Sequence, residues 1–217
     1  MDFELARRNM VDNQVRTNRV TDSLVISALR AIPRELFVPA AQKGVSYVDD
    51  DIAVAPGRYL MEPMILARLL QLAEIQHTDV VLDVGCATGY SSAVLGKMAS
   101  SVVALEQDPE LVNWAAETLL GLGIDNAAVV EGELVQGLPD QGPYDVIFVN
   151  GAMDRVPEGL REQLADGGRL VGVLQGEKGI GHATLVTRSG TAFGHRTDFD
   201  ANARMLPGFA RKTAFVF

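Results

Sequence analysis

Residues 80–90 have the sequence Val80-Val81-Leu82-Asp83-Val84-Gly85-Cys86-Ala87-Thr88-Gly89-Tyr90, and they are the most informative segment of the chain. Its first five residues form a short apolar run of the kind that is buried in a parallel sheet. The two glycines that follow permit tight backbone turns and a close approach of a ligand to the main chain. A helix is expected from about Tyr90 to Met98. The stretch therefore predicts a strand, a glycine turn and a helix at the carboxyl edge of a sheet.

The same alternation of strand and helix continues toward the C-terminus. We predict helices after the Asp108-Pro109 cap and near Pro157. The apolar runs predict strands over 102–105, 128–130, 144–149 and 169–174, then hairpin-like strands over 183–187, 192–197 and 212–217. This order predicts an α/β fold with a doubly wound, Rossmann-like and mainly parallel sheet, helices on both faces and antiparallel C-terminal edge strands.

The residues before this series predict helix and loop. Thr21-Asp22 is expected to cap a helix that Pro33 ends, and a second helix is expected to start at Pro63. We therefore predict a single domain, in which 1–62 form a helical N-terminal extension and substrate loop and 63–217 form the α/β core.

Composition narrows the class of protein. The chain has 217 residues, 47% of them hydrophobic and 22% charged, which is typical of a folded globular protein. Its net charge of −9 disfavours binding to phosphate backbones, and no apolar run approaches the roughly 20 residues of a membrane span. One cysteine, Cys86, excludes an internal disulfide and suits a reducing compartment. The acidic N-terminus does not resemble a signal peptide, so we expect a cytoplasmic location without nucleic-acid or membrane partners. The oligomeric state stays open.

The glycine turn departs from the dinucleotide pattern G-x-G-x-x-G, because Ala87 replaces the second glycine and Tyr90 the third. Asp83 at the end of the strand suits a ligand with a positive amino or sulfonium group. The next strand ends in Glu106, and a carboxylate at that point can accept from both hydroxyls of a ribose. This combination of acid, glycine turn and acid predicts a site for a nucleoside cofactor.

These residues resemble motif I of the class I S-adenosylmethionine-dependent methyltransferases, with one conservative departure at Ala87. The resemblance implies S-adenosylmethionine as cofactor, S-adenosylhomocysteine as product, and a ribose contact for Glu106. It implies an adenine contact for the loop Glu131-Gly132-Glu133, unless Glu131 and Glu133 are only solvated loop acids. Cys86 is expected to be a packing residue. The candidate cofactor residues are Asp83, Val84, Gly85, Cys86, Ala87, Gly89, Tyr90, Glu106, Gln107, Gly132, Glu133 and Asn150.

Further segments resemble the protein-L-isoaspartate O-methyltransferases more closely. They are Met10–Arg16, Ala31–Pro39, which contains Pro-Arg-Glu-Leu-Phe-Val-Pro, Tyr47–Asp49, Gly89–Leu95, Tyr144–Ile147 and Gln163–Leu170. The resemblance implies methylation of the carboxylate of damaged aspartyl residues in a protein or peptide. That carboxylate is already ionised at neutral pH, so it needs no general base. This agrees with a chain whose three histidines, His77, His182 and His195, suggest neither a catalytic triad nor a metal site.

The resemblance fails in the substrate loop. The family pattern Gly-Gln-Thr-Ile-Ser-x-Pro aligns with Gly57–Pro63, so that Arg58, Tyr59 and Met61 stand at the Gln, Thr and Ser positions. Met61 cannot donate a hydrogen bond to a carboxylate. Arg58 is either a substitute donor for the acceptor carboxylate or an exposed loop residue. Three functions therefore remain: an isoaspartyl methyltransferase, a methyltransferase with another acceptor, and a cofactor-binding protein that has lost this activity.

Overall fold

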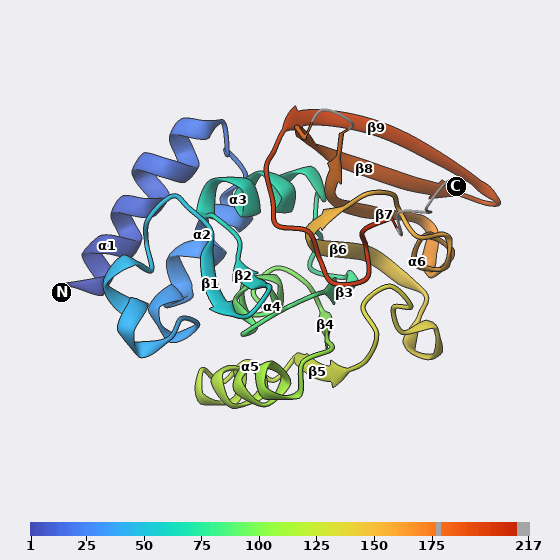
Figure 1. Ribbon diagram of the computed structural model, residues 1–217. Helices are drawn as coiled ribbons and strands as arrows, with labels where there is room; N and C mark the ends of the chain where they lie inside the picture. The colour runs from blue at the N-terminus through green and yellow to red at the C-terminus, as the bar shows by residue number, and fades with distance from the viewer. Residues whose placement is uncertain (177–178, 212–217) are drawn as a thin grey trace, which may run out of the picture.

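The computed structural model describes residues 1–176 and 179–211, and its centre is a seven-stranded sheet (Figure 1). The strand order is β5-β4-β3-β6-β7-β8-β9. The first five strands in this order pair in parallel, and β8 and β9 add an antiparallel edge. The strands are β3 (Val80–Val84), β4 (Ser101–Glu106), β5 (Ala127–Glu131), β6 (Tyr144–Met153), β7 (Leu164–Gln175), β8 (Gly181–Ser189) and β9 (Ala192–Asp200). The predicted fold class is confirmed.

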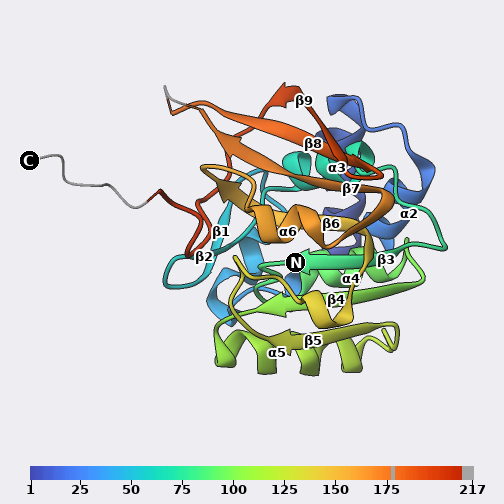
Figure 2. The same ribbon diagram turned by 90° about the vertical axis from the view of Figure 1, so that its right-hand side faces the viewer.

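Alternate residues of the parallel strands enter two apolar clusters, one on each face of the sheet. Val81, for example, packs with the cluster that contains residues of α2 to α5, and its neighbour Leu82 packs with the cluster that contains Leu160 of α6. Figure 2 shows α6 on one side of the sheet and α2 and α3 on the other. These helices are α2 (Ser23–Ala31), α3 (Pro63–Leu72), α4 (Tyr90–Gly96), α5 (Pro109–Gly121) and α6 (Glu158–Glu162).

The caps expected from the sequence are present. Asp22 accepts hydrogen bonds from the main-chain N–H groups of Leu24 and Val25 at the start of α2. Asp108 accepts from the N–H of Glu110 at the start of α5. Both caps satisfy donors that have no partner within the first helical turn.

The first 62 residues are helical for the most part, but the expectation of helix and loop alone is wrong. They contain α1 (Phe3–Met10), a π-helical turn (Val11–Val15), and 3-10 turns over Arg16–Asn18, Arg34–Leu36 and Ala40–Val45. They also contain the antiparallel hairpin β1 (Ile52–Ala55) and β2 (Arg58–Leu60). The turn Pro56-Gly57, with Gly57 at a φ of +70°, joins the two strands. The apolar runs on either side of it are too short to stand out as strands.

After β9 the chain returns to the carboxyl end of β6. The N–H of Ala152 donates to the carbonyl of Arg204 at 2.8 Å, and the N–H of Leu206 donates to the carbonyl of Ala152 at 3.0 Å. The segment 203–206 therefore lies beside the strand ends at which the site was predicted. The strand expected over 212–217 lies outside the described residues. Within 1–176 and 179–211, no helix is long and apolar enough to cross a membrane.

Candidate active site

The glycine turn between β3 and α4 has the backbone conformation that its sequence predicts. Gly85 and Gly89 have φ values of +80° and +91°, which favour glycine, and Ala87 has a φ of +51°. The N–H groups of Gly85 and Cys86 both donate to the carbonyl of Leu105 on β4. A Cβ on Gly89 would lie 3.0 Å from the Cβ of Ala115 on α5. The turn is therefore held against β4 and α5.

Asp83 lies beneath the turn and is fully buried. One of its carboxylate oxygens accepts from the hydroxyls of Ser91 and Ser92, at 2.6 and 2.7 Å. The amide of Asn150, from β6, donates to the same Ser91 hydroxyl at 2.8 Å. Burial raises the pKa of Asp83 to about 6, against the opposing effect of the two hydroxyls. Asp83 thus connects β3, α4 and β6, and its contact with a ligand remains a prediction.

Glu106 ends β4 and is also fully buried. One carboxylate oxygen accepts from the N–H groups of Gln107 and Asp108, at 2.9 and 3.3 Å. The other accepts from the N–H of Ala87 at 2.8 Å and from Nη2 of Arg58 at 2.5 Å. The structure therefore places this carboxylate directly beside the glycine turn, as the strand pattern predicts.

Arg58 is 4% exposed, so it is not the exposed loop arginine that the sequence left open. It starts β2 and faces inward, as does Leu60, whereas Tyr59 between them is half-buried. The guanidinium of Arg58 forms a buried ion pair with Glu106. In this conformation the guanidinium of Arg58 is paired with Glu106, the proposed ribose-binding acid, and is therefore not available to bind an acceptor carboxylate.

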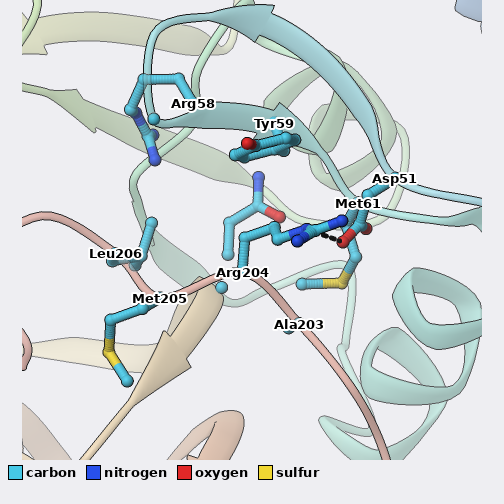
Figure 3. Close-up of a pocket in the computed structure, with 11 residues that line it drawn as sticks. Asp51, Arg58, Tyr59, Met61, Ala203, Arg204, Met205 and Leu206 are labelled. Carbon is cyan, nitrogen blue, oxygen red and sulfur yellow. Dashed lines mark ion pairs between the residues drawn. The ribbon is translucent and has the colours of Figure 1, made fainter.

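A cavity of about 10 Å³ separates the β1–β2 hairpin from the segment 203–206 (Figure 3). Arg58, Tyr59 and Met61 line it together with Asn150, so the structure brings the three substrate-loop positions to the same place. Figure 3 shows Arg204 reaching Asp51, with 3.4 Å between the charged atoms. The Arg204 guanidinium lies 5.0 Å from the centroid of the Tyr59 ring. The roles of Arg58, Tyr59 and Met61 in catalysis remain predictions.

Other candidate residues lie apart from this cavity. The side chains of Gln107 and Glu133 are exposed, and Gly132 is half-buried. Val84, Cys86 and Ala87 are buried. Tyr90 packs edge-on against Phe37, with ring centroids 5.4 Å apart. The structure therefore gives Tyr90 and Cys86 packing contacts, and it brings together Asp83, Glu106, Asn150 and the turn itself.

Sequence reasoning did not find the support that Arg34 gives to the site. Arg34 is fully buried, and its guanidinium donates to the carbonyls of Ser46 and Met61 at 2.7 and 2.8 Å. Thr88 in the glycine turn donates its hydroxyl to the carbonyl of Phe37 at 2.7 Å. The segment Pro33–Pro39 thus connects the substrate loop to the turn. The sequence showed the segment as distinctive, but it did not show its contacts.

Leu206 is the second residue that sequence reasoning missed. It is 2% exposed and packs over two glycines of the site. A Cβ on Gly85 would lie 3.0 Å from its Cδ2, and a Cβ on Gly151 would lie 2.6 Å from its Cγ. Leu206 is far from both glycines in sequence, so no local pattern predicts this contact.

The buried thiol of Cys86 is expected to be unreactive in the folded protein. Burial raises its pKa, and the neighbouring carboxylates Asp83 and Glu106 raise it further. We expect its alkylation by iodoacetamide at about pH 8 to be at least about 100-fold slower in native protein than in denatured protein. Mass spectrometry of the time course measures the two rates. Equal rates would show that the turn opens readily.

Glu62 is expected to make the protein less stable as pH rises through the acidic range. Burial and the charges of Asp49, Asp50 and Asp51 raise its pKa from 4.5 to about 7. A carboxyl group with a raised folded-state pKa binds more protons in the folded state, so its contribution to stability falls between those two values. Because Glu62 is partly exposed, solvent screening limits the effect to about 1 kcal/mol.

The variant Glu62→Gln tests this expectation. It should be more stable than the natural chain by about 1 kcal/mol at about pH 8 and equal to it at about pH 4. Urea denaturation at both pH values measures the difference. A gain of the same size at both pH values would contradict the electrostatic cause.

Comparison with known proteins agrees with this geometry. A family model described as protein-L-isoaspartate(D-aspartate) O-methyltransferase matches residues 6–192. The chain belongs to this family. The match includes β1, β2 and every strand of the sheet as far as the start of β9. The match therefore covers the β1–β2 hairpin with Arg58 and Tyr59, and Met61 directly after it.

Individual relatives of the protein-L-isoaspartate O-methyltransferase family cover most of the chain. The one from Koribacter versatilis is 41% identical over 169 residues, which is 78% of this chain and 76% of the relative. The one from Methanoculleus marisnigri is 36% identical over 184 residues, covering 85% of this chain and 84% of the relative. Among solved structures, a protein-L-isoaspartate O-methyltransferase superimposes with a TM-score of 0.82 at 24% identity, over 93% of this chain and 66% of the other.

A structure from Plasmodium falciparum has the same fold. It is described as a putative protein-L-isoaspartate O-methyltransferase in complex with S-adenosyl-L-homocysteine. It superimposes with a TM-score of 0.78 at 20% identity, over 91% of this chain and 96% of that one.

Proposed function

We propose that this chain is an S-adenosylmethionine-dependent methyltransferase that acts on the carboxylate of isoaspartyl residues in damaged proteins. One observation carries the proposal: in a chain of this family, Glu106 lies beside the glycine turn at the carboxyl edge of the sheet. The substrate is a protein or peptide, in line with the names of the relatives. A cytoplasmic location agrees with a single buried cysteine, and the acidic net charge disfavours nucleic acid.

The residues at the site suit the cofactor in chemistry. The Glu106 carboxylate is an acceptor for ribose hydroxyls, and Gly85 allows a ligand to approach the main chain. When bound, the cofactor supplies an electrophilic methyl group. The space does not suit it in this conformation, because Arg58 and Leu206 lie over Gly85 and the adjoining cavity of about 10 Å³ has room for about one water molecule. Pockets for ligands of this size measure about 300–1,000 Å³. Binding therefore requires a more open arrangement of these side chains.

A different acceptor is the second candidate function. Tyr59 and Met61 line the cavity at the positions where the family carries hydroxyl groups. A missing hydrogen bond to an anion costs about 1.5–3 kcal/mol, so isoaspartyl turnover should be slow unless Tyr59 supplies the donor. This loop favours a methyltransferase whose acceptor differs from isoaspartate.

Transfer of labelled methyl groups to paired peptides tests the proposal. The two peptides differ only in an isoaspartyl or an aspartyl linkage, and methyl esters are recognised by their release in mild base. Transfer confined to the isoaspartyl peptide supports the proposed function. Transfer to neither peptide, in a protein that binds S-adenosylhomocysteine by calorimetry, would leave the second candidate or a binding protein without turnover.

A variant with the family's residues at positions 59 and 61 separates the two candidate functions more sharply. In the double variant Met61→Ser, Tyr59→Thr we expect isoaspartyl turnover to rise by about tenfold or more, because Ser and Thr hydroxyls then stand at the two positions where the family has them. The measurement is kcat/KM for the isoaspartyl peptide. An unchanged or lower value would show that the natural loop is suited to its own acceptor.

A further inference from the structure

The hydrogen-bond acceptors of Glu106 are all in use. A carboxylate has about four acceptor positions, and Glu106 accepts from Ala87, Gln107, Asp108 and Arg58. The first three donors are main-chain N–H groups whose positions are set by the turn and by the end of β4. Only Arg58 donates from a side chain, so it is the one donor that can leave without unfolding the turn.

The volume above the turn is filled from two directions. A Cβ on Gly85 would lie 3.2 Å from Nη2 of Arg58 and 3.0 Å from Cδ2 of Leu206. Arg58 reaches this point from β2, and Leu206 from the segment that returns to β6. The space that a glycine leaves for a ligand is thus taken by two side chains of the same protein.

We propose that Arg58 and Leu206 occupy the nucleoside part of the cofactor site, and that cofactor binds only when Arg58 leaves Glu106. The inference rests on the proposed function. Arg58 then sets the affinity of this chain for its cofactor, because the ligand hydroxyls must replace a charged donor on Glu106.

Replacing Arg58 by ligand hydroxyls on Glu106 costs binding free energy. A hydrogen bond between two charged groups is about twice as strong as one between neutral groups, and the pair lies in a water-excluded site. If the conformation that binds is only a small fraction of the population, the apparent dissociation constant rises by the inverse of that fraction. Replacing Arg58 removes the side chain that competes with the ligand hydroxyls for the Glu106 carboxylate. Glu106 then keeps its three main-chain donors.

Calorimetric titration of S-adenosylhomocysteine into the natural chain and the variant Arg58→Gln tests the inference. We expect Arg58→Gln to bind at least about tenfold more tightly. Leu206→Ala keeps every charge and opens space over Gly85 and Gly151, so it should also bind more tightly. This variant provides the test if Arg58→Gln does not fold. Arg169→Gln is the matched control, because it breaks another ion pair, to Asp79 at 2.6 Å, at the amino end of the strands. Its affinity should stay within about twofold of the natural chain.

Two nucleosides separate competition between Arg58 and ligand hydroxyls for Glu106 from a general loosening of the fold. The gain in affinity in Arg58→Gln should be larger with adenosine than with 2′,3′-dideoxyadenosine, because the second ligand profits from the vacated space but lacks the hydroxyls that replace Arg58 on Glu106. The inference is overturned if the natural chain binds S-adenosylhomocysteine and neither Arg58→Gln nor Leu206→Ala binds it more tightly. That result leaves the proposed function in place. Failure of the natural chain and of both variants to bind S-adenosylhomocysteine overturns both.

Discussion

Replacing Arg34 by methionine is expected to lower the free energy of unfolding by about 3–5 kcal/mol. The guanidinium of Arg34 is fully buried and donates to the carbonyls of Ser46 and Met61. It also lies 4.8 Å from the centroid of the Tyr90 ring. Methionine fills most of the volume but leaves two buried carbonyls without their donor, and each loss costs most of a charge-assisted hydrogen bond. Urea denaturation measures the change.

Arg30→Met is the control for this prediction. Arg30 forms an ion pair with Asp12 at 2.6 Å, but its side chain is 44% exposed, unlike that of Arg34. Exposed pairs contribute at most about 1 kcal/mol, so this variant should lose less than that. Similar losses in the two variants would mean that Arg34 contributes no more than a surface charge. The account of how the substrate loop is held would then be wrong.

Replacing Glu106 by glutamine is expected to destabilise the chain by about 3–5 kcal/mol and to abolish binding of S-adenosylhomocysteine. The substitution keeps the shape of the side chain but removes the negative charge that Arg58 faces in a buried position. It also places an amide NH₂ group among donors, where the carboxylate accepts from Ala87 and Gln107. Urea denaturation and calorimetry measure the two effects.

Two comparisons separate the ion pair from other effects of this substitution. Glu131 on β5 pairs in register with Glu106, but its side chain is exposed, so Glu131→Gln should change stability by less than about 0.5 kcal/mol. The double variant Glu106→Gln, Arg58→Gln removes both charges. It should be less destabilised than the sum of the single variants by at least about 1 kcal/mol. Additive effects would contradict a direct interaction between the two side chains.

Sequence patterns predicted the centre of the sheet because β3, β4 and β6 are largely buried. Val80–Val84 and Tyr144–Val149 are apolar except for one aspartate each, and such short apolar runs are typical of a central parallel strand. The caps at Asp22 and Asp108 were predictable for a similar reason, since they depend on residues only two or three positions away. The hairpin of β1 and β2 was missed because its strands have four and three residues. Strands so short carry little periodic signal.

The site was predictable where it depends on one strand and its turn. Asp83, Gly85 and Glu106 follow from the strand positions, and the structure brings them to one edge of the sheet. The partners of Glu106 and Gly85 were not predictable, because Arg58 and Leu206 approach from segments that precede and follow the sheet core. The sequence suggested Arg58 as a donor to a carboxylate. It did not show that the nearest carboxylate is one of the chain's own.

A crystal structure of the natural chain soaked or grown with S-adenosylhomocysteine shows directly whether Arg58 leaves Glu106 when the ligand binds. We expect the ligand over the glycine turn, with its ribose hydroxyls donating to Glu106 and the Arg58 guanidinium moved away from that carboxylate. The side chain of Leu206 should also be displaced from Gly85. A ligand bound elsewhere, or a ligand over the turn with the Arg58–Glu106 pair still at 2.5 Å, would show that Arg58 does not compete with the cofactor for Glu106.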